Sequence, residues 1–234
     1  MACAHFGLIP AAGSSLRFGG PLPKQYQRLC GGTLLEHAVR ALACAAQIRT
    51  IYVVVAPDDE HFRACAFDGV AAQVVALYCG GPTRAASVFN GLMAMRNAVD
   101  DGDWLLVHDA ARACVSEGEL ARLLAEAADD EVGGLLALPV VDTLKRADDD
   151  GRSSATVSRV GLWRAVTPQM FRYRLLVEAL RRADLALVTD EASAIESLGL
   201  RPRLVQAAST NIKVTYPEDL TIARAILESR GHPT

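Results

Sequence analysis

The chain has 234 residues, of which 51% are hydrophobic and 22% charged, and its formal net charge is −3 at pH 7. This composition is typical of a globular protein with a sizeable core. It offers neither the basic field that nucleic acid requires nor an apolar run of the roughly 18 residues that a membrane span needs. Six scattered cysteines without a C-x-x-C pair, and an N-terminus without a signal-peptide pattern, predict reduced thiols in the cytoplasm rather than disulfides or a zinc site.

The first predicted element is a buried strand over residues 5–9, which is followed by a long loop over 10–26. The loop consists of small residues, glycines and prolines, and it carries two cations, Arg17 and Lys24. Small residues let backbone N–H groups approach a ligand closely, and fixed cations add charge where a polyphosphate would lie. The loop therefore predicts a nucleoside-triphosphate site, although its spacing matches neither the P-loop nor the dinucleotide fingerprint. The alternative is an ordinary glycine- and proline-rich loop with two solvated cations.

Strands and helices alternate as far as about residue 140. Capping boxes that open at Thr33 and Ser116 predict helices to about Ala45 and Ala128. Apolar runs predict buried strands over 51–56, 73–78, 104–109 and 134–140, with a short helix starting at 57–59 and a longer one after Arg84. This alternation predicts an α/β fold in three layers, with a mostly parallel, twisted sheet covered by helices on both faces.

Three of the predicted loops belong to the same rim of that sheet. In a parallel sheet, ligands bind beyond the carboxyl ends of the strands. The residues that the loops after the first, third and fourth predicted strands bring to this rim are Gly13, Arg17 and Lys24, then Gly81, Arg84 and Ser87, then Asp109 and Arg112. This convergence indicates one ligand site more strongly than any single loop does.

The alternation breaks between residues 141 and 161, where the chain is polar and charged. Asp150 and Gly151 predict a turn between two extended arms, so the segment is either a solvated hairpin or an arm that embraces a second subunit. The elements predicted after it are strands over 162–166, 204–207 and 212–214 and helices over 173–183, from Thr189 or Asp190 onward, and over 217–227. No linker or repeat divides the chain, so residues 1–234 are predicted to form a single domain, with 141–161 as a protruding β-hairpin arm.

Eight segments carry a family resemblance, and they occur in the order PAAGSSLRFGGPLPKQY, GGPTRAASV, HDAAR, DTLKR, SRVGLW, TPQMF, TDEAS and NIKVTYPEDL. Together they resemble the 2-C-methyl-D-erythritol 4-phosphate cytidylyltransferase family of the non-mevalonate route to isoprenoids, over nearly the whole chain. The first loop belongs broadly to nucleotidyltransferases, and HDAAR narrows the match to cytidylyltransferases. Two positions depart from the family pattern: Ala113 stands where proline is usual, and Tyr216 stands where many relatives carry a basic residue.

The resemblance implies a nucleotidyltransferase-like Rossmann variant that transfers CMP from CTP to 2-C-methyl-D-erythritol 4-phosphate. The products would be 4-diphosphocytidyl-2-C-methyl-D-erythritol and pyrophosphate. It also implies a Mg²⁺ ion held mainly by the CTP phosphates and a homodimer joined through the hairpin arms. The nucleophile is already a phosphate anion, so catalysis would rest on positioning two repelling anions and neutralising charge at the α-phosphate.

The resemblance also implies which residues form the site. Arg17 and Lys24 would contact the triphosphate and stabilise its developing charge. The nucleotide would lie against Pro10, Ala11, Ala12, Gly13, Gly81, Ser87 and Asp109. The residues that would hold the sugar-alcohol phosphate are Asp109, Thr143, Arg159, Thr167, Thr189 and Lys213. Of these, Thr143 and Arg159 would act in the neighbouring subunit's site, and a cation such as Lys213 in an apolar stretch is costly unless it meets an anion.

Structural alternatives stay open for four of these residues, whose hydroxyl or carboxylate could serve a helix, turn or cap instead: Ser87, Asp109, Thr167 and Thr189. Beside them, Arg112 is predicted to be an ion-pair partner and His108 a packed histidine.

Two rival functions also stay open. Ribitol 5-phosphate could be the alcohol, because the last motifs fit that related cytidylyltransferase as well. A catalytically silent nucleotide-binding regulatory module is a rival of another class, but an inactive relative would have no reason to keep Arg17, Lys24, Arg159 and Lys213. A dehydrogenase is disfavoured because its glycine fingerprint is missing.

Overall fold

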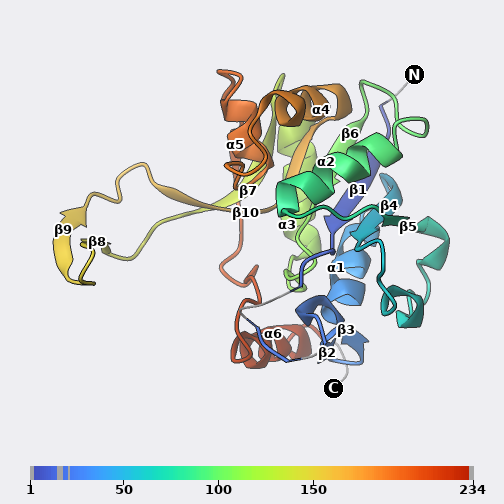
Figure 1. The fold of residues 1–234 in the computed structure, drawn as a ribbon, viewed down its shortest axis with the longest axis horizontal. Coiled ribbons are helices and arrows are strands. Elements are labelled where there is room, and N and C mark those ends of the chain that lie inside the picture. The colour runs from blue at the N-terminus through green and yellow to red at the C-terminus, as the bar shows by residue number, and fades with distance from the viewer. Residues whose placement is uncertain (1–2, 15–17, 21, 232–234) are drawn as a thin grey trace.

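A mostly parallel sheet of seven strands forms the centre of the molecule (Figure 1). The computed structural model describes residues 3–14, 18–20 and 22–231. In spatial order the strands are β11 (Arg203–Gln206), β7 (Gly133–Pro139), β10 (Trp163–Arg172), β6 (Trp104–Val107), β1 (His5–Pro10), β4 (Ile48–Val55) and β5 (Val74–Tyr78). Strand β10 runs antiparallel to both of its neighbours, β6 and β7, and the other described pairs of this sheet are parallel.

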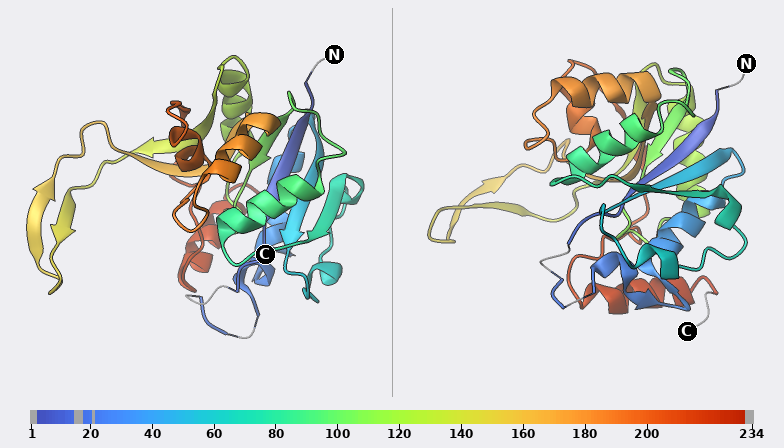
Figure 2. Two further views of the ribbon diagram at one scale, coloured as in Figure 1. Left: turned by 45° about the horizontal axis from the view of Figure 1, so that its top comes forward. Right: turned by 45° about the vertical axis from the view of Figure 1, so that its right-hand side comes forward.

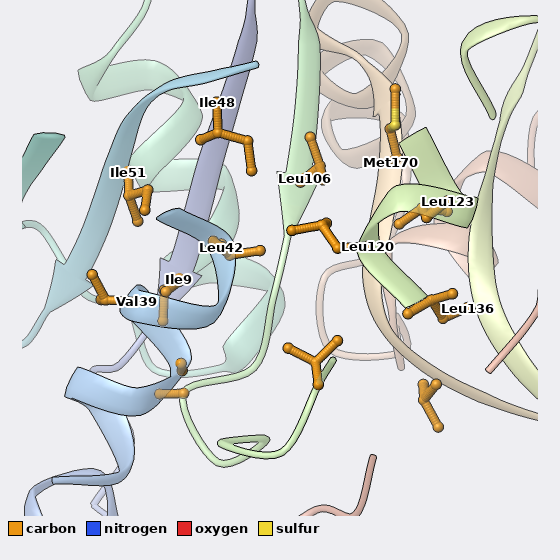
Figure 3. Close-up of a cluster of buried hydrophobic side chains, with 14 of the residues drawn as sticks. Ile9, Val39, Leu42, Ile48, Ile51, Leu106, Leu120, Leu123, Leu136 and Met170 are labelled. Carbon is orange, nitrogen blue, oxygen red and sulfur yellow. The ribbon is translucent and has the colours of Figure 1, made fainter. Parts of the chain in front are cut away.

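Helices cover both faces of the sheet, which confirms the predicted three-layer α/β architecture (Figures 1 and 2). They are α1 (Leu34–Ala43), α2 (Arg84–Ala94), α3 (Glu117–Ala128), α4 (Tyr173–Arg182) and α5 (Glu191–Glu196). The last helix, α6 (Asp219–Glu228), packs in a separate buried cluster that includes Leu29 and Val214. Leu42 of α1 and Leu123 of α3 pack with Ile9 and Met170 of the strands in the buried cluster on one face (Figure 3). Helices α2, α4 and α5 contribute to the cluster on the other face. Among the described residues, no helix is long and apolar enough to cross a bilayer.

Three of the helices begin with the capping pattern that their sequences predict. The side chains of Thr33, Ser116 and Asp190 each accept the backbone N–H of the residue three positions later, and that residue's side chain bonds back to the cap. This reciprocal bonding satisfies N–H groups that the first turn of a helix otherwise leaves without a partner, and each cap contributes about 1 kcal/mol.

The main correction to the predicted strands concerns β10. The sequence predicts a strand that ends at 166, just before Thr167 and Pro168, but β10 continues to Arg172. Its pairing with β7 shifts register between Ala165 and Gln169. The strand then resumes because Met170 and Phe171, both fully buried, pair with β6 and β7. A proline can occupy such an irregular position, since it removes only one ladder donor.

Three smaller predictions are also wrong. No helix starts at 57–59; instead the Asp59 carboxylate accepts the N–H groups of His61 and Phe62 and leads into a later 3₁₀ turn, Phe62–Ala64. Residues 212–214 form no strand, and they lie outside the sheet. The last helix begins at Asp219 rather than 217, because the Asp219 carboxylate accepts the N–H groups of residues 215 and 216 and holds them in a turn.

The segment between β7 and β10 projects far from the body of the molecule (Figures 1 and 2). It contains the antiparallel pair β8 (Leu144–Ala147) and β9 (Ser153–Val157). The tip includes Gly151, whose φ of +75° is readily adopted only by glycine. A second small pair, β2 (Arg28–Leu29) and β3 (Gly32–Thr33), leads into α1. We call residues 141–161 the arm.

Candidate active site

Two adjoining pockets open at the carboxyl ends of β1 and β6. The first has a volume of about 330 Å³ and is lined by Pro10, Ala11, Ala12, Gly13, Ser14, Lys24, Gln25, Gly81, Pro82, Thr83, Arg84, Ser87, Asp109, Ala110, Ala111 and Lys213. The second has a volume of about 240 Å³ and is lined by Arg84, Asp109, Arg112, Ala165, Val166, Thr167, Gln169, Thr189, Asp190 and Lys213. Arg84, Asp109 and Lys213 line both pockets, so the pockets share a wall of charged side chains.

The structure brings most of the predicted site residues to these pockets. The first pocket contains those predicted to contact the nucleotide, namely Pro10, Ala11, Ala12, Gly13, Lys24, Gly81, Ser87 and Asp109. Thr167 and Thr189 line the second pocket, and Lys213 lines both. Thr143 and Arg159 lie exposed on the arm, and neither lines one of these two pockets. Arg17 lies outside the described residues.

The loop after β1 is held in place by a side chain that the sequence reasoning missed. The Gln25 amide, which is buried, donates hydrogen bonds to the carbonyls of Ala11 at 2.7 Å and Gly13 at 3.2 Å. Lys24 Nζ, in the same 3₁₀ turn, donates to the Val214 carbonyl at 3.0 Å. These contacts tie the first loop to itself and to the segment that carries Lys213.

The loop after β5 packs directly against the loop after β1. A Cβ atom at Gly80 would lie 2.3 Å from the Cβ of Ala12 and 2.9 Å from the Val55 carbonyl oxygen, so only glycine fits there. The neighbouring turn is held by Ser87, whose hydroxyl accepts the Gly81 N–H and donates to the Thr83 carbonyl, both at 3.0 Å. Ser87 thus makes the backbone contacts of its structural alternative while also lining the first pocket.

Asp109 is the centre of the charged wall. Its Oδ1 accepts from Arg84 Nε at 2.8 Å, its Oδ2 lies 2.8 Å from Lys213 Nζ, and Arg112 Nε lies 3.7 Å from Oδ2. Burial alone would raise the pKa of the Asp109 carboxyl, but the positive charges of Arg84, Lys213 and Arg112 outweigh it and hold the pKa well below its usual range. Asp109 is therefore a permanent anion at neutral pH.

A second carboxylate, Glu191, completes this cluster, and the sequence reasoning assigned it no role. Both of its oxygens are bonded by Arg84, with Nη1 to Oε1 at 2.7 Å and Nη2 to Oε2 at 3.0 Å. Glu191 is only 1% exposed and is the first residue of α5. In the sequence, only its place after the helix cap in the TDEAS segment marks Glu191, because neither its burial nor its partner Arg84 can be seen there.

The side chains of His108 and Thr167 contact each other next to Asp109. The fully buried His108 ring lies 3.0 Å from Thr167 Oγ1 and 3.1 Å from the Arg112 carbonyl, and burial lowers the pKa of His108 to about 4. Thr167 Oγ1 also accepts the Asp109 backbone N–H at 3.0 Å. His108 is therefore a packed, neutral histidine, as predicted. The Thr167 hydroxyl thus bonds residues after β6 rather than its own turn or a helix cap. Arg112 makes the predicted ion pair and donates to the Asn211 carbonyl.

The second pocket is bounded by the N-terminal end of α5. Thr189 lies at its mouth, and Asp190 caps the helix. The Gln169 side chain, fully buried on β10, donates to Asp190 Oδ2 at 2.9 Å and accepts the Ala192 N–H at 2.8 Å. These bonds fix the turn that carries Thr189 against the sheet.

The described residues contain no group of three or more His, Cys, Asp or Glu side chains that could hold a metal ion. In the pocket wall, the oxygens of Asp109 are already engaged by Arg84 and Lys213. The donor set of the described residues therefore does not fit a metal bound mainly by protein ligands.

Two cation-lined pockets that share a wall at the carboxyl ends of a mostly parallel sheet are the arrangement expected of a nucleotidyltransferase. The family profile "IspD: 2-C-methyl-D-erythritol 4-phosphate cytidylyltransferase" matches residues 6–229. The chain belongs to this family.

Similar proteins agree in sequence and in structure. The chain is 52% identical over 226 residues to the 2-C-methyl-D-erythritol 4-phosphate cytidylyltransferase of Dechloromonas aromatica (strain RCB), covering 97% of this chain and 98% of that relative. A crystal structure of 4-diphosphocytidyl-2C-methyl-D-erythritol synthase is similar with a TM-score of 0.86 at 40% identity, covering 97% of this chain and 100% of the other. The 2-C-methyl-D-erythritol 4-phosphate cytidylyltransferase of Thermus thermophilus gives a TM-score of 0.76 at 33% identity, over 95% and 98% of the two chains.

Proposed function

We propose that this chain transfers CMP from CTP to 2-C-methyl-D-erythritol 4-phosphate, in non-mevalonate isoprenoid biosynthesis in the cytoplasm. The observation that carries the proposal is the charged wall, because Lys213 lines both pockets with 39% of its side chain exposed and each pocket needs positive charge for a phosphorylated ligand.

The reaction needs positioning rather than a strong base. An oxygen of the alcohol's phosphate attacks the α-phosphorus of CTP, and the bond from that phosphorus to the oxygen bridging to the β-phosphorus breaks. Pyrophosphate leaves with the bonding electron pair. No proton has to be removed from the attacking group, which agrees with a site whose histidine is buried and neutral. Lys24 and Arg17 neutralise the triphosphate charge that grows during this displacement.

CTP occupies the first pocket, with the cytidine against residues 10–13 and the Gly81 turn, which line that pocket. The alcohol phosphate occupies the second pocket. There Lys213 holds the phosphate, the Asp109 carboxylate accepts hydrogen bonds from the hydroxyl groups, and Thr167 and Thr189 contact the alcohol. Asp109 thus lies between the two substrates.

A Mg²⁺ ion, where bound, would be held mainly by the CTP phosphate oxygens and water. This agrees with the donor set, since the described residues that line the first pocket provide a single carboxylate, Asp109, that is already paired with cations. A bound ion of this kind would neutralise phosphate charge and so lower the repulsion between the two substrates.

A homodimer completes the site through the arm. The arm exposes apolar side chains in the segments that connect its hairpin to β7 and β10, including Val141 at 71% and Val160 at 87% exposed. A two-stranded hairpin without further support is marginal in water, which favours a second copy as its packing partner. Thr143 and Arg159 then reach the second pocket of the neighbouring subunit.

The test is pyrophosphate release from CTP and Mg²⁺ with each of two alcohols, 2-C-methyl-D-erythritol 4-phosphate and ribitol 5-phosphate. We expect a clear preference for the methylerythritol phosphate. A clear preference for ribitol 5-phosphate would overturn the substrate assignment. CTP binding without turnover on either alcohol would instead favour a regulatory module.

A further inference from the structure

We propose that Glu191 is a positioning residue of the transfer reaction, which holds Asp109 in the wall between the two pockets through its bidentate clasp on Arg84. The inference rests on the proposed cytidylyl transfer and adds a residue to which that mechanism gives no role.

We call the bidentate ion pair between Glu191 and Arg84 the clasp, and the planar guanidinium of Arg84 makes it directional. A guanidinium is planar and carries its N–H donors in a fixed fork. Glu191 takes both Nη groups, at 2.7 and 3.0 Å, so the plane and the direction of the remaining Nε–H are determined. That Nε donates to Asp109 Oδ1 at 2.8 Å. The orientation of Glu191 therefore sets the orientation of the Asp109 carboxylate, whose other oxygen faces Lys213.

Glu191 cannot act on a substrate directly. It is 1% exposed and is not among the described residues that line either pocket. A carboxylate buried in this way is costly unless it is paired, so its place in the fold depends on Arg84. Its own backbone is fixed by the Asp190 cap and by the bonds of Gln169 to the first turn of α5. Glu191 is thus a rigid anchor for the long and otherwise flexible side chain of Arg84.

The clasp also joins the walls of the two pockets. Arg84 is the first residue of α2 and follows Thr83, which lines the first pocket. Glu191 is the first residue of α5 and follows Asp190, which lines the second pocket. Loosening the clasp should leave the CTP loop in place, because Gln25 holds it, and should misplace Asp109 in the wall that the alcohol phosphate shares.

The test is a double-mutant cycle with Glu191→Gln, Arg84→Lys and the double variant. KM for each substrate and kcat are measured by pyrophosphate release, and unfolding is followed by heating. Glu191→Gln keeps the size of the side chain but turns an N–H donor toward an arginine donor. Arg84→Lys keeps the charge but loses the fork. Glu196→Gln, an exposed glutamate on the same helix, is the matched control.

We expect Glu191→Gln to raise KM for the alcohol phosphate about 10-fold, as for loss of a charged hydrogen bond, with a smaller rise in KM for CTP, because hydrogen bonds from Gln25 and Ser87 also hold the first pocket. In the Arg84→Lys background the same change should have little further effect, because Glu191 acts only through Arg84. Glu196→Gln should match the wild type. If Glu191→Gln does not fold, Glu191→Asp, which shortens the reach by one methylene, replaces it in the cycle.

The proposal is overturned if the Glu191 variant keeps the wild-type KM for the alcohol, or if it raises this KM equally in both backgrounds. A fall in melting temperature alone, with unchanged KM values, would leave Glu191 a purely structural partner and would also overturn it. Failure of the wild type to release pyrophosphate with either alcohol would refute the proposed function itself, and the two failures are therefore distinguishable.

Discussion

Lys213 Nζ lies 2.8 Å from Oδ2 of Asp109, although Asp109 follows strand β6 of the sheet and Lys213 precedes the last helix. The contact places a lysine beside a carboxylate at the shared wall of both pockets. Lys213 is partly exposed, with 39% of its side chain open to solvent, so its charge remains available to an anionic ligand. The pair links the C-terminal segment to the sheet.

Lys213→Ala should chiefly raise KM for the alcohol phosphate, by roughly 10- to 100-fold, because it removes a charged hydrogen bond at the second pocket. Steady-state kinetics with saturating CTP measure this value. Arg201→Ala is the control, since Arg201 is exposed and lies outside the residues described as lining either pocket. An unchanged KM for the alcohol in Lys213→Ala would contradict the assigned role.

Lys24→Ala should lower kcat by roughly 10²–10³, by analogy with the loss of one donor to a developing oxyanion. CTP binding should survive in part, because the backbone of residues 10–13 still lines the pocket. Single-turnover kinetics and calorimetric titration with CTP separate the two effects. Wild-type turnover in this variant would remove Lys24 from the mechanism.

Gly80→Ala should destabilise the protein by about 1–3 kcal/mol and raise KM for CTP, because an added Cβ forces two packed loops apart. The contact is with Ala12 Cβ at 2.3 Å and with rigid backbone at Val55. Gly118→Ala is the control, since the nearest atom to its added Cβ is a side-chain tip 3.9 Å away. The melting temperature and KM for CTP are measured for both variants. Equal values for Gly80→Ala and Gly118→Ala would contradict the prediction, because they would show that the two loops move apart at little cost.

The stability of the protein should depend on pH through His108. Its pKa is about 4 in the folded protein and about 6.5 when unfolded. Because the folded pKa is the lower one, the unfolded chain binds the proton first. Stability is therefore full above pH 6.5 and is lost as the pH falls, by about 3 kcal/mol near pH 4. The free energy of unfolding, measured with denaturant at several pH values, should depend less on pH in His108→Gln than in His61→Gln. An equal pH dependence in the two variants would contradict the role given to His108.

Sites shared across a dimer predict that two inactive variants recover activity when mixed. Lys24→Ala and Arg159→Ala subunits, paired at random, leave one intact site in each mixed dimer, or about a quarter of wild-type activity. Val160→Asp added to both chains should weaken the arm contact and abolish the recovery. Leu187→Asp, which charges an equally exposed apolar residue on the body, should not. Mixed dimers that form without regaining activity would rule out the shared site.

The sequence predicted the elements whose signals are local. The capping boxes at Thr33 and Ser116 and the apolar strands carry their information within a few residues, and the structure has them nearly as predicted. The full course of β10 was not predictable in this way. Its second half is a strand because Met170 and Phe171 meet β6 and β7, which are distant in sequence. Pro168 was interpreted as the end of the strand. Whether a proline ends a strand depends on the neighbouring strands, which the local sequence does not show.

The same distinction applies to the site. Glycine-rich loops and cations at strand ends were visible in the sequence, and most of these residues line the two pockets. Glu191 and Gln25 were missed because their importance lies in what they bond: Arg84 in one case and the Ala11 carbonyl in the other. Lys213 was expected in a strand, yet its position comes from the turn around Asp219 and from its ion pair with Asp109.

Strand β10 runs from Trp163, where the arm returns to the body, past Thr167 and Gln169 at the second pocket, and on to Arg172. Strand β10 therefore connects the arm to the body and also forms part of the lining of that pocket. A partner that binds the arm would therefore be coupled through β10 to the lining of the second pocket, so that binding at the arm and turnover would depend on the same strand.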